Sequence, residues 1–262
     1  MEIVGYLASV CIGLILGLLG GGGSILSIPI LVYLFHVDAV LASAYSLFIV
    51  GTTSLVGTIP KYKEQLVNIK TGFQFGIPSI LTIFTTRRWI VPAIPDVILQ
   101  TDAMIISKRL LLLGLFAVLM VLASISMIRG RQEFKSDERS YAAVFIALEG
   151  ILIGFLTGLV GAGGGFLIIP ALVLLTGLTF KAAVGTSLFI IAVNSLTGFL
   201  GDVMNYRIDW EFLLLITVLA VAGVLIGSRL SHKIPSAQLR KAFGWLVLVM
   251  GCWILFHEIV LV

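Results

Sequence analysis

The residues best placed to do chemistry lie in two glycine-rich stretches, each of which interrupts a long apolar run. Residues 17–31 read GLLGGGGSILSIPIL, and residues 158–172 read GLVGAGGGFLIIPAL. A helix that starts directly after glycines presents free N–H groups and the positive end of its dipole, and the missing Cβ lets an anion approach closely. The residues predicted to bind an anion in this way are Gly21, Gly22, Gly23, Ser24, Gly163, Gly164 and Gly165.

The two helix starts differ in how their N–H groups can be satisfied. Ser24 can cap the first helix, but Phe166 cannot cap the second, so the glycine backbone alone must supply the donors there. The competing interpretation is that the glycines only allow helices to pack closely, as small residues often do in membranes.

Polar side chains inside the apolar runs form a second set of candidate ligands. The predicted members are Ser46, Thr53, Ser54, Thr186, Ser187 and Asn194. Asn194, which is followed by Ser195, is the costliest of them to bury without a partner, so we expect it to line the substrate path. Alternatively, the serines and threonines bond carbonyls of their own helices.

Charged residues inside the apolar runs are rare. Glu149 and Asp202 could each carry a coupling proton, because a carboxyl group in apolar surroundings is readily protonated; an interfacial position is the alternative for Glu149. Arg87 and Arg88 could form an access funnel for anions, or could anchor the chain at the membrane interface together with Trp89.

These residues must be positioned by membrane helices. The chain of 262 residues is 59% hydrophobic and 11% charged, whereas an average soluble domain is about 25% charged. The apolar runs are continuous and do not alternate, so they predict an all-α polytopic membrane protein and exclude an outer-membrane barrel. The expected segments are 1–20, 24–35, 39–59, 71–86, 110–128, 141–160, 166–177, 180–201, 210–227 and 241–262.

The distribution of charge and cysteine agrees with a membrane protein. The net charge of +4 does not indicate a nucleic-acid partner, because lysine and arginine lie at the ends of the apolar runs. We expect a multi-pass protein of the cytoplasmic (inner) membrane, with the lipid bilayer as its surroundings. Cys11 and Cys252 are predicted to be buried as small apolar residues.

The chain contains an internal repeat. Besides the glycine stretches, YSLFIVGTTSLVG at 45–57 matches TSLFIIAVNSLTG at 186–198 with the same offset. We predict a first repeat over 1–128, a charged cytoplasmic linker over 129–140 and a second repeat over 141–262. A duplication kept for structure alone is the alternative to a substrate path between the repeats.

The threading of the glycine stretches decides how the repeats are related. As a single helix, residues 3–35 would be about 50 Å long, against a hydrocarbon core of about 30 Å. If each stretch forms a re-entrant hairpin, each repeat has three spanning helices, the repeats are inverted, and most of the 17 lysines and arginines fall on one side. If each crosses once, the basic residues divide evenly. The positive-inside rule favours inverted repeats with both termini outside.

These motifs resemble those of a known family. The paired G-x-x-G-x-G-G motifs followed by Pro29 and Pro170, the S-L-F block in each repeat, and TTRRWIVPAIPD at 85–96 are similar to the sulfite exporter TauE/SafE family, also called the toluene-sulfonate uptake permease family. The resemblance covers almost the whole chain. It implies an integral-membrane transporter of sulfite, sulfonates, sulfoacetate, thiosulfate or related anions.

The predicted function is secondary transport of a small anion by alternating access, without a cofactor, a metal or catalysis. No H-E-x-x-H motif and no Walker A motif is present in the sequence. A coupling proton or sodium ion and a homodimer are further partners that such a transporter could use. The alternatives are a passive anion channel, a carrier of a non-sulfur carboxylate, a structural membrane protein and an intramembrane enzyme.

Overall fold

The computed structural model describes residues 2–19, 24–101, 104–129, 143–161, 163–176, 178–231 and 234–260. Nearly all of these residues are helical, as predicted. The first part of the chain contains α1 (Glu2–Leu19), α2 (Ser24–Pro29), η1 (Ile30–Leu34), α3 (Ala39–Lys63), α4 (Ile69–Thr85), η2 (Thr86–Ile90), α5 (Val91–Ala93) and α6 (Lys108–Arg129). The second part contains α7 (Ala143–Val160), α8 (Gly165–Thr176), α9 (Phe180–Val203), α10 (Trp210–Ser231) and α11 (Ser236–Val260).

A short hairpin interrupts this helical pattern and was not predicted. Strands β1 (Val97–Thr101) and β2 (Met104–Ser107) pair antiparallel, with Val97 opposite Ser107 and an irregular register after Val97. The hairpin follows the two prolines of the segment 85–96 and leads directly into α6.

Several of the apolar runs form helices long enough to cross a membrane. Within the described residues, four helices are long and apolar enough to cross a membrane, namely α3, α6, α10 and residues Lys181–Val203 of α9. Large apolar side chains on the outside of the helices, such as Leu7, Leu122 and Val218, suit contact with lipid tails. Cys11 and Cys252 are also exposed on helix surfaces, so the expectation that they are buried is wrong.

Polar residues at the helix starts act as caps. The Asp38 side chain accepts hydrogen bonds from the amides of Val40 and Leu41 at the start of α3, and the Asp209 side chain accepts one from Phe212 N at the start of α10. These contacts satisfy amides that have no intrahelical partner.

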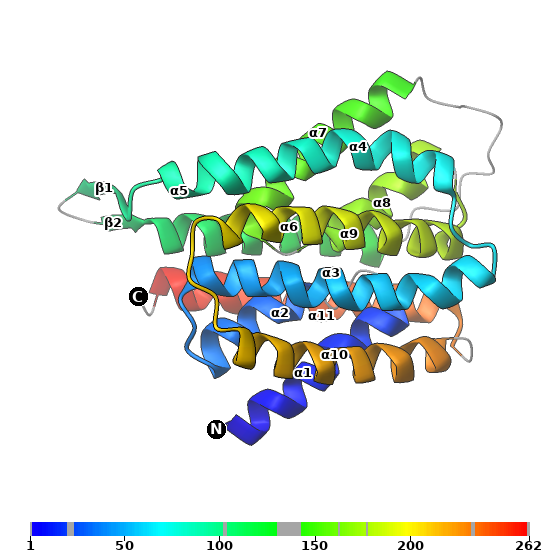
Figure 1. Cartoon of the computed structure of the whole chain (residues 1–262), viewed down its shortest axis with the longest axis horizontal. Helices are drawn as coiled ribbons and strands as arrows, with labels where there is room; N and C mark the ends of the chain where they lie inside the picture. Colours follow the sequence, from blue (N-terminus) through cyan, green and yellow to red (C-terminus); the bar gives the residue numbers. More distant parts are fainter. Residues whose placement is uncertain are drawn as a thin grey trace.

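The first glycine-containing run folds back on itself. The Tyr6 ring near the start of α1 lies 5.7 Å from the Phe35 ring that follows η1, measured between ring centroids. A run that crossed the membrane once would hold these two rings at opposite faces. The chain therefore returns to the level at which it began, and Figure 1 shows α2 running back toward the end of the bundle at which α1 starts.

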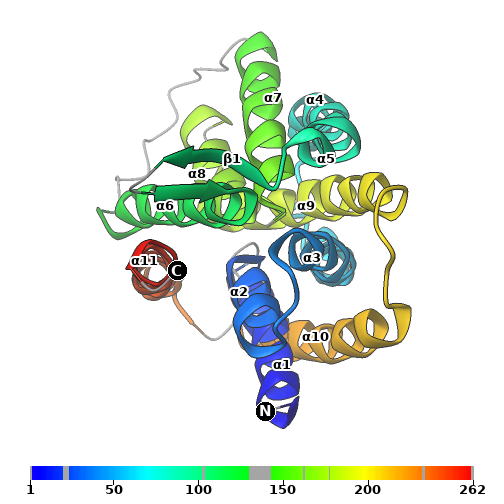
Figure 2. The same ribbon diagram turned by 90° about the vertical axis from the view of Figure 1, so that its left-hand side faces the viewer.

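Helices far apart in sequence are paired around a central contact. In Figure 2, α3 and α9 lie side by side at the centre, α1 with α10 on one side, and α4 with α7 on the other. The pair α6 and α11 completes the bundle. Both ends of the chain lie at the same end of the bundle (Figure 1).

The α1–α10 and α7–α4 pairs pack closely through glycines at corresponding positions of the two halves. A Cβ added to Gly13 of α1 would collide with the backbone of Ala220 in α10, and a Cβ added to Gly154 of α7 would lie 2.6 Å from the carbonyl oxygen of Ser79 in α4. A shift of 141 residues, which takes Gly17 to Gly158, also takes Gly13 to Gly154 and Ser79 to Ala220. Gly17, which does belong to the first glycine-rich stretch, also lies against α10, where an added Cβ would be 2.5 Å from the Val224 carbonyl oxygen. For this glycine, close packing is observed as the alternative interpretation expects.

Candidate functional site

The second glycine stretch forms a tight loop between α7 and α8. Gly161, Gly163 and Gly164 have φ of +78°, +67° and +69°, a conformation that other residues rarely adopt. The Gly164 carbonyl accepts from Leu167 N at 2.9 Å and from Ile168 N at 3.0 Å. The amides of Gly164, Gly165 and Phe166 precede these first helical bonds, so they form the positive start of α8.

Two buried hydroxyl groups lie against this loop without a hydrogen-bond partner among the described residues. The Ser195 Oγ of α9 would lie 2.9 Å from a Cβ added to Gly163, and the Thr157 side chain of α7 lies directly against Gly164. Ser195 is 0% exposed and Thr157 is 2% exposed. Buried hydroxyls normally have partners, so a polar ligand between them and the loop would complete their hydrogen bonding.

Asn194 extends the same polar surface. Its Nδ2 donates to the Ser79 Oγ of α4 at 2.6 Å, while its Oδ1 has no partner among the described residues. Both side chains are buried. The structure thus brings Asn194, predicted from the sequence, next to Ser79, which was not.

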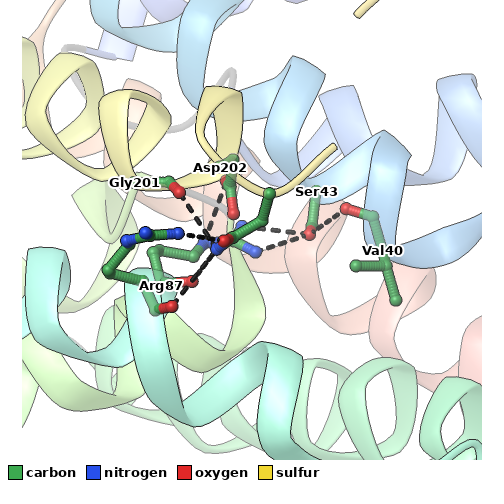
Figure 3. A network of polar contacts seen from close by, with 7 residues as sticks. Val40, Ser43, Arg87, Gly201 and Asp202 are labelled. Carbon is green, nitrogen blue, oxygen red and sulfur yellow. Dashed lines mark hydrogen bonds and ion pairs between the residues drawn. The ribbon is translucent and has the colours of Figure 1, made fainter. Parts of the chain in front are cut away.

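An ion pair lies at the other end of the loop. Arg87 of η2 is 0% exposed, and its Nη1 and Nη2 donate to the Ser43 Oγ of α3 at 2.9 and 3.0 Å. Its Nε lies 3.4 Å from the Asp202 Oδ2 of α9. Figure 3 shows Arg87 reaching between these helices, with Ser43 donating in turn to the Val40 carbonyl. A Cβ on Gly161 would collide with Arg87 Nη2, so the guanidinium borders the glycine loop.

The π-helical turn η2 holds Arg87 in place. The Asn205 Nδ2 donates to the carbonyls of Arg88 and Gly201 at 3.2 and 3.1 Å, and the Asn205 Oδ1 accepts from Arg88. These bonds tie η2 to the end of α9. Single π turns occur frequently at functional sites, where they redirect one side chain out of the helical register. Because Arg87 is fully buried, the expected exposed access funnel does not include it.

The remaining predicted residues have different surroundings. Thr53 donates to the Ile49 carbonyl at 2.6 Å and Ser187 to the Val184 carbonyl at 2.9 Å, as the alternative expects. Thr186 accepts from Asn68 N at 2.9 Å, and the hydroxyls of Ser46 and Ser27 are 2.5 Å apart. The Ser54 hydroxyl is buried without a described partner.

Some of the residues predicted from the sequence lie outside the residues that the structure describes. They are Gly21, Gly22 and Gly23 of the first glycine stretch and residues 130–142, which contain nearly all of the predicted linker. Ser24 begins α2, and its role as a cap stays a prediction.

Thr157, Ser79, Ser43 and the pairing of Arg87 with Asp202 were missed from the sequence. Thr157 stands four residues before Gly161, where one helical turn separates them, and that spacing could have identified it. The ion pair had no comparable signal, because its partners belong to different halves of the chain.

A separate ionic cluster lies at the end of the bundle where the chain terminates. The Glu258 carboxylate of α11 accepts from the Tyr33 hydroxyl of η1 at 2.9 Å and from Arg109 Nη2 of α6, also at 2.9 Å. The Tyr33 ring also packs against Trp253, with 4.6 Å between ring centroids. These contacts fasten the returning arm of the first hairpin to α6 and α11.

The sequence is similar to known proteins along nearly its whole length. The family model described as sulfite exporter TauE/SafE matches residues 6–254. The probable membrane transporter protein YunE of Bacillus subtilis is 28% identical over 277 residues, covering 97% of this chain and 98% of that protein. A probable membrane transporter protein of Xylella fastidiosa is 27% identical, covering 94% of this chain and 92% of that protein.

No solved structure matches the chain. The match to the family model instead covers almost all of the helices described above, together with the glycine loop and the ion pair. The predicted resemblance is confirmed, and the chain belongs to the sulfite exporter TauE/SafE family of membrane proteins.

Proposed function

We propose that this protein is a secondary transporter that moves a small anion, in the first instance sulfite, an organosulfonate or a related sulfur-containing anion, across the cytoplasmic membrane by alternating access. The observation that carries the proposal is the start of α8. The amides that precede the first helical hydrogen bonds of α8, the Thr157 and Ser195 hydroxyls, which have no hydrogen-bond partner among the described residues, and the buried Arg87 all meet at one glycine loop. Such a site suits an anion and needs neither a metal nor a cofactor.

The names of the family and of its relatives support transport. The family is described as a sulfite exporter, and the relatives are named probable membrane transporters. Both point away from catalysis. The sulfur-containing substrate comes from the family description alone, because the geometry of the loop selects for negative charge and hydrogen-bond acceptors.

We further propose that the two halves are inverted repeats, joined by a cytoplasmic linker. Two observations support this relation. The close contacts of α1 with α10 and of α7 with α4 exchange under the 141-residue shift, and the first glycine run folds back, which leaves the first half an odd number of crossings. Opposed halves around α3 and α9 are suited to alternating access.

Thermal unfolding of the purified protein with a panel of anions tests the proposal. The panel contains sulfite, sulfate, thiosulfate, sulfoacetate, taurine, acetate and chloride at equal ionic strength. An anion present at about 100 times its Kd should stabilise the protein by about 2.7 kcal/mol. Thr157→Val and Ser195→Ala should lose this gain while the protein without ligand unfolds as before.

Thr217→Val is the matched control. Thr217 is a buried threonine of α10 whose hydroxyl donates to its own helix at Leu213 O, away from the loop. This variant should keep the full response. Stabilisation by acetate alone would indicate a carboxylate carrier, and no stabilisation by any anion of the panel would contradict the proposed site. In a flux measurement, anion movement that follows the voltage without any counter-ion would indicate a channel.

A further inference from the structure

The Arg87–Asp202 ion pair joins the two halves of the chain at a fully buried position. Arg87 comes from η2 and Asp202 from the last turn of α9, and both are 0% exposed. Burial of two opposite charges costs free energy that the pairing only partly returns, so a buried ion pair is weak evidence for a stabilising role. The geometry of the ion pair points to a role other than stabilising the fold.

The geometry leaves both partners incompletely satisfied. The closest approach is 3.4 Å, from Arg87 Nε to Asp202 Oδ2, and neither oxygen of Asp202 accepts a hydrogen bond from a described residue. Both Nη atoms of Arg87 share one acceptor, the Ser43 Oγ. A buried carboxylate normally accepts several hydrogen bonds. Asp202 is therefore held by charge alone, and neutralising it would break no hydrogen bond to the described residues.

Few ionisable groups surround Asp202 in the described residues. Arg87 faces it directly, and Tyr206 lies in the loop that follows α9. Burial, and secondarily the charge of Asp202, raises the pKa of the Tyr206 hydroxyl, so that this group stays neutral at physiological pH. The charges of Asp38 and Asp96 act on the pKa of Tyr206 in the same direction, but more weakly.

The other elements that pack on α9 add little charge near Asp202. α8 contains no ionisable residue, and the one in α4, Lys70, stands in its first turn. α3 places Ser43 at Arg87, whereas Lys61 and Lys63 lie in its last turn. Arg88 of η2 is engaged by Asn205. A change in the charge of Asp202 would therefore be felt mainly by Arg87.

Arg87 also borders the proposed anion site, since its Nη2 lies against Gly161. We propose that Asp202 carries the coupling proton, and that Arg87 exchanges its counter-ion between the Asp202 carboxylate and the transported anion. This inference rests on the proposed function. The proton comes from a hydronium ion of the adjoining solution, so one O–H bond breaks in the donor and one forms on Asp202, and the arriving anion balances the charge of Arg87.

The charge balance fixes the expected coupling. One proton and one monovalent anion leave the net charge of the site unchanged, so the two should bind together and move in the same direction. A divalent anion would carry one negative charge across the membrane with each proton. Anion binding should strengthen as the pH falls, because protonated Asp202 no longer competes for Arg87.

The test uses the full chain in liposomes that contain a pH-sensitive dye. Thiosulfate and methanesulfonate are the main probes, because both are anions of strong acids and bring no titrating proton of their own; sulfite is the third probe. Uptake of each anion and acidification of the lumen are measured together under an imposed anion gradient. The wild-type protein should take up about one proton with each anion.

Asp202→Asn mimics the protonated carboxyl group and is the decisive variant. It should bind and exchange the anion independently of pH, and should lose the coupled proton movement completely. Asp209→Asn is the matched control, since Asp209 only caps α10, and it should behave as the wild type. The double variant Arg87→Met with Asp202→Asn removes both charges without leaving one unpaired, so it should fold and lose anion binding.

The two proposals fail in different ways. Coupled proton movement that persists in Asp202→Asn, or anion uptake by the wild type without any proton, would overturn the coupling role and leave the transporter intact. No uptake of any of the three anions by the wild type would overturn the proposed function and the coupling role together.

Discussion

Two helix pairs in this protein pack in the same way but differ in the polar residues buried around them. α7 packs on α4 and α1 packs on α10, in each case with glycines of the first-named helix against the backbone of the other. Around α4 and α7 lie Ser79, Thr157 and Arg87, all buried. The Thr157 hydroxyl and the Arg87 Nε make no hydrogen bond to a described residue, although Arg87 Nε faces Asp202 in the ion pair. The corresponding positions on α10 and α1 are Ala220, Leu16 and Ser228.

The comparison separates two roles of the small residues. Close packing occurs at both pairs, so it belongs to the fold and does not by itself mark a site. Buried polar atoms that make no hydrogen bond to a described residue occur at the α4–α7 pair, and they mark the region where we place the anion. Substitutions at corresponding positions of the two halves can therefore test the assignment directly.

The largest difference is expected at Arg87 and Ser228. Arg87→Met leaves Asp202 buried and unpaired, which should lower the free energy of unfolding by about 3–5 kcal/mol. Ser228→Ala, at the corresponding position, should change it by less than about 1 kcal/mol. Thermal unfolding in detergent measures both changes. Equal losses of unfolding free energy would show that the residues at positions 87 and 228 contribute equally to stability.

The packing glycines should respond alike in the two halves. Gly154→Leu and Gly13→Leu each force a large side chain against backbone, at a cost of about 1–3 kcal/mol, or more where the helices cannot separate. The ratio of folded to aggregated protein after membrane extraction, together with the unfolding temperature, reports the effect. If only Gly154→Leu destabilised the protein, the symmetric packing would not be a shared property of the fold.

Exchange of a hydroxyl group between the halves sharpens the comparison. Thr157→Val should remove anion-induced stabilisation with little change in the protein alone, because its hydroxyl makes no hydrogen bond to a described residue. Leu16→Thr, the reciprocal change, should cost about 1–3 kcal/mol through a buried hydroxyl without a partner. It should create no new anion response, and a gain of binding there would argue that either half can serve as the site.

The smallest effect is expected away from both pairs. Tyr33→Phe removes the hydroxyl that donates to Glu258 and keeps the aromatic contact with Trp253. The loss should be about 0.5–1.5 kcal/mol, with unchanged anion binding. Altered anion selectivity in this variant would extend the functional region to the end of the bundle.

The sequence was sufficient to predict the helical, membrane-spanning character of the chain. Apolar runs predicted the helices, and the length of residues 3–35 showed that this run must break or fold back. The distribution of basic residues favoured the hairpin, in agreement with the contact between Tyr6 and Phe35. These features depend on local composition and on length, which a sequence displays directly.

Contacts between distant segments could not be predicted in the same way. Arg87 meets Asp202 because η2 is a π turn fixed by Asn205, and no local pattern announces either fact. The exposure of Cys11 and Cys252 has a different cause. In a membrane, apolar residues face both the core and the lipid, so hydropathy does not tell the two surfaces apart.

The exchanged pairing of α1 with α10 and of α7 with α4 has a consequence for how the protein can be assembled. The first helix of each half packs against a helix of the other half, α1 on α10 and α7 on α4, so each half contributes a helix to the packing of the other. A half produced alone would leave the backbone-contacting face of α1 or α7 without its partner. Two separate polypeptides, divided between α6 and α7, should therefore be recovered as stable protein only when both are made in the same membrane.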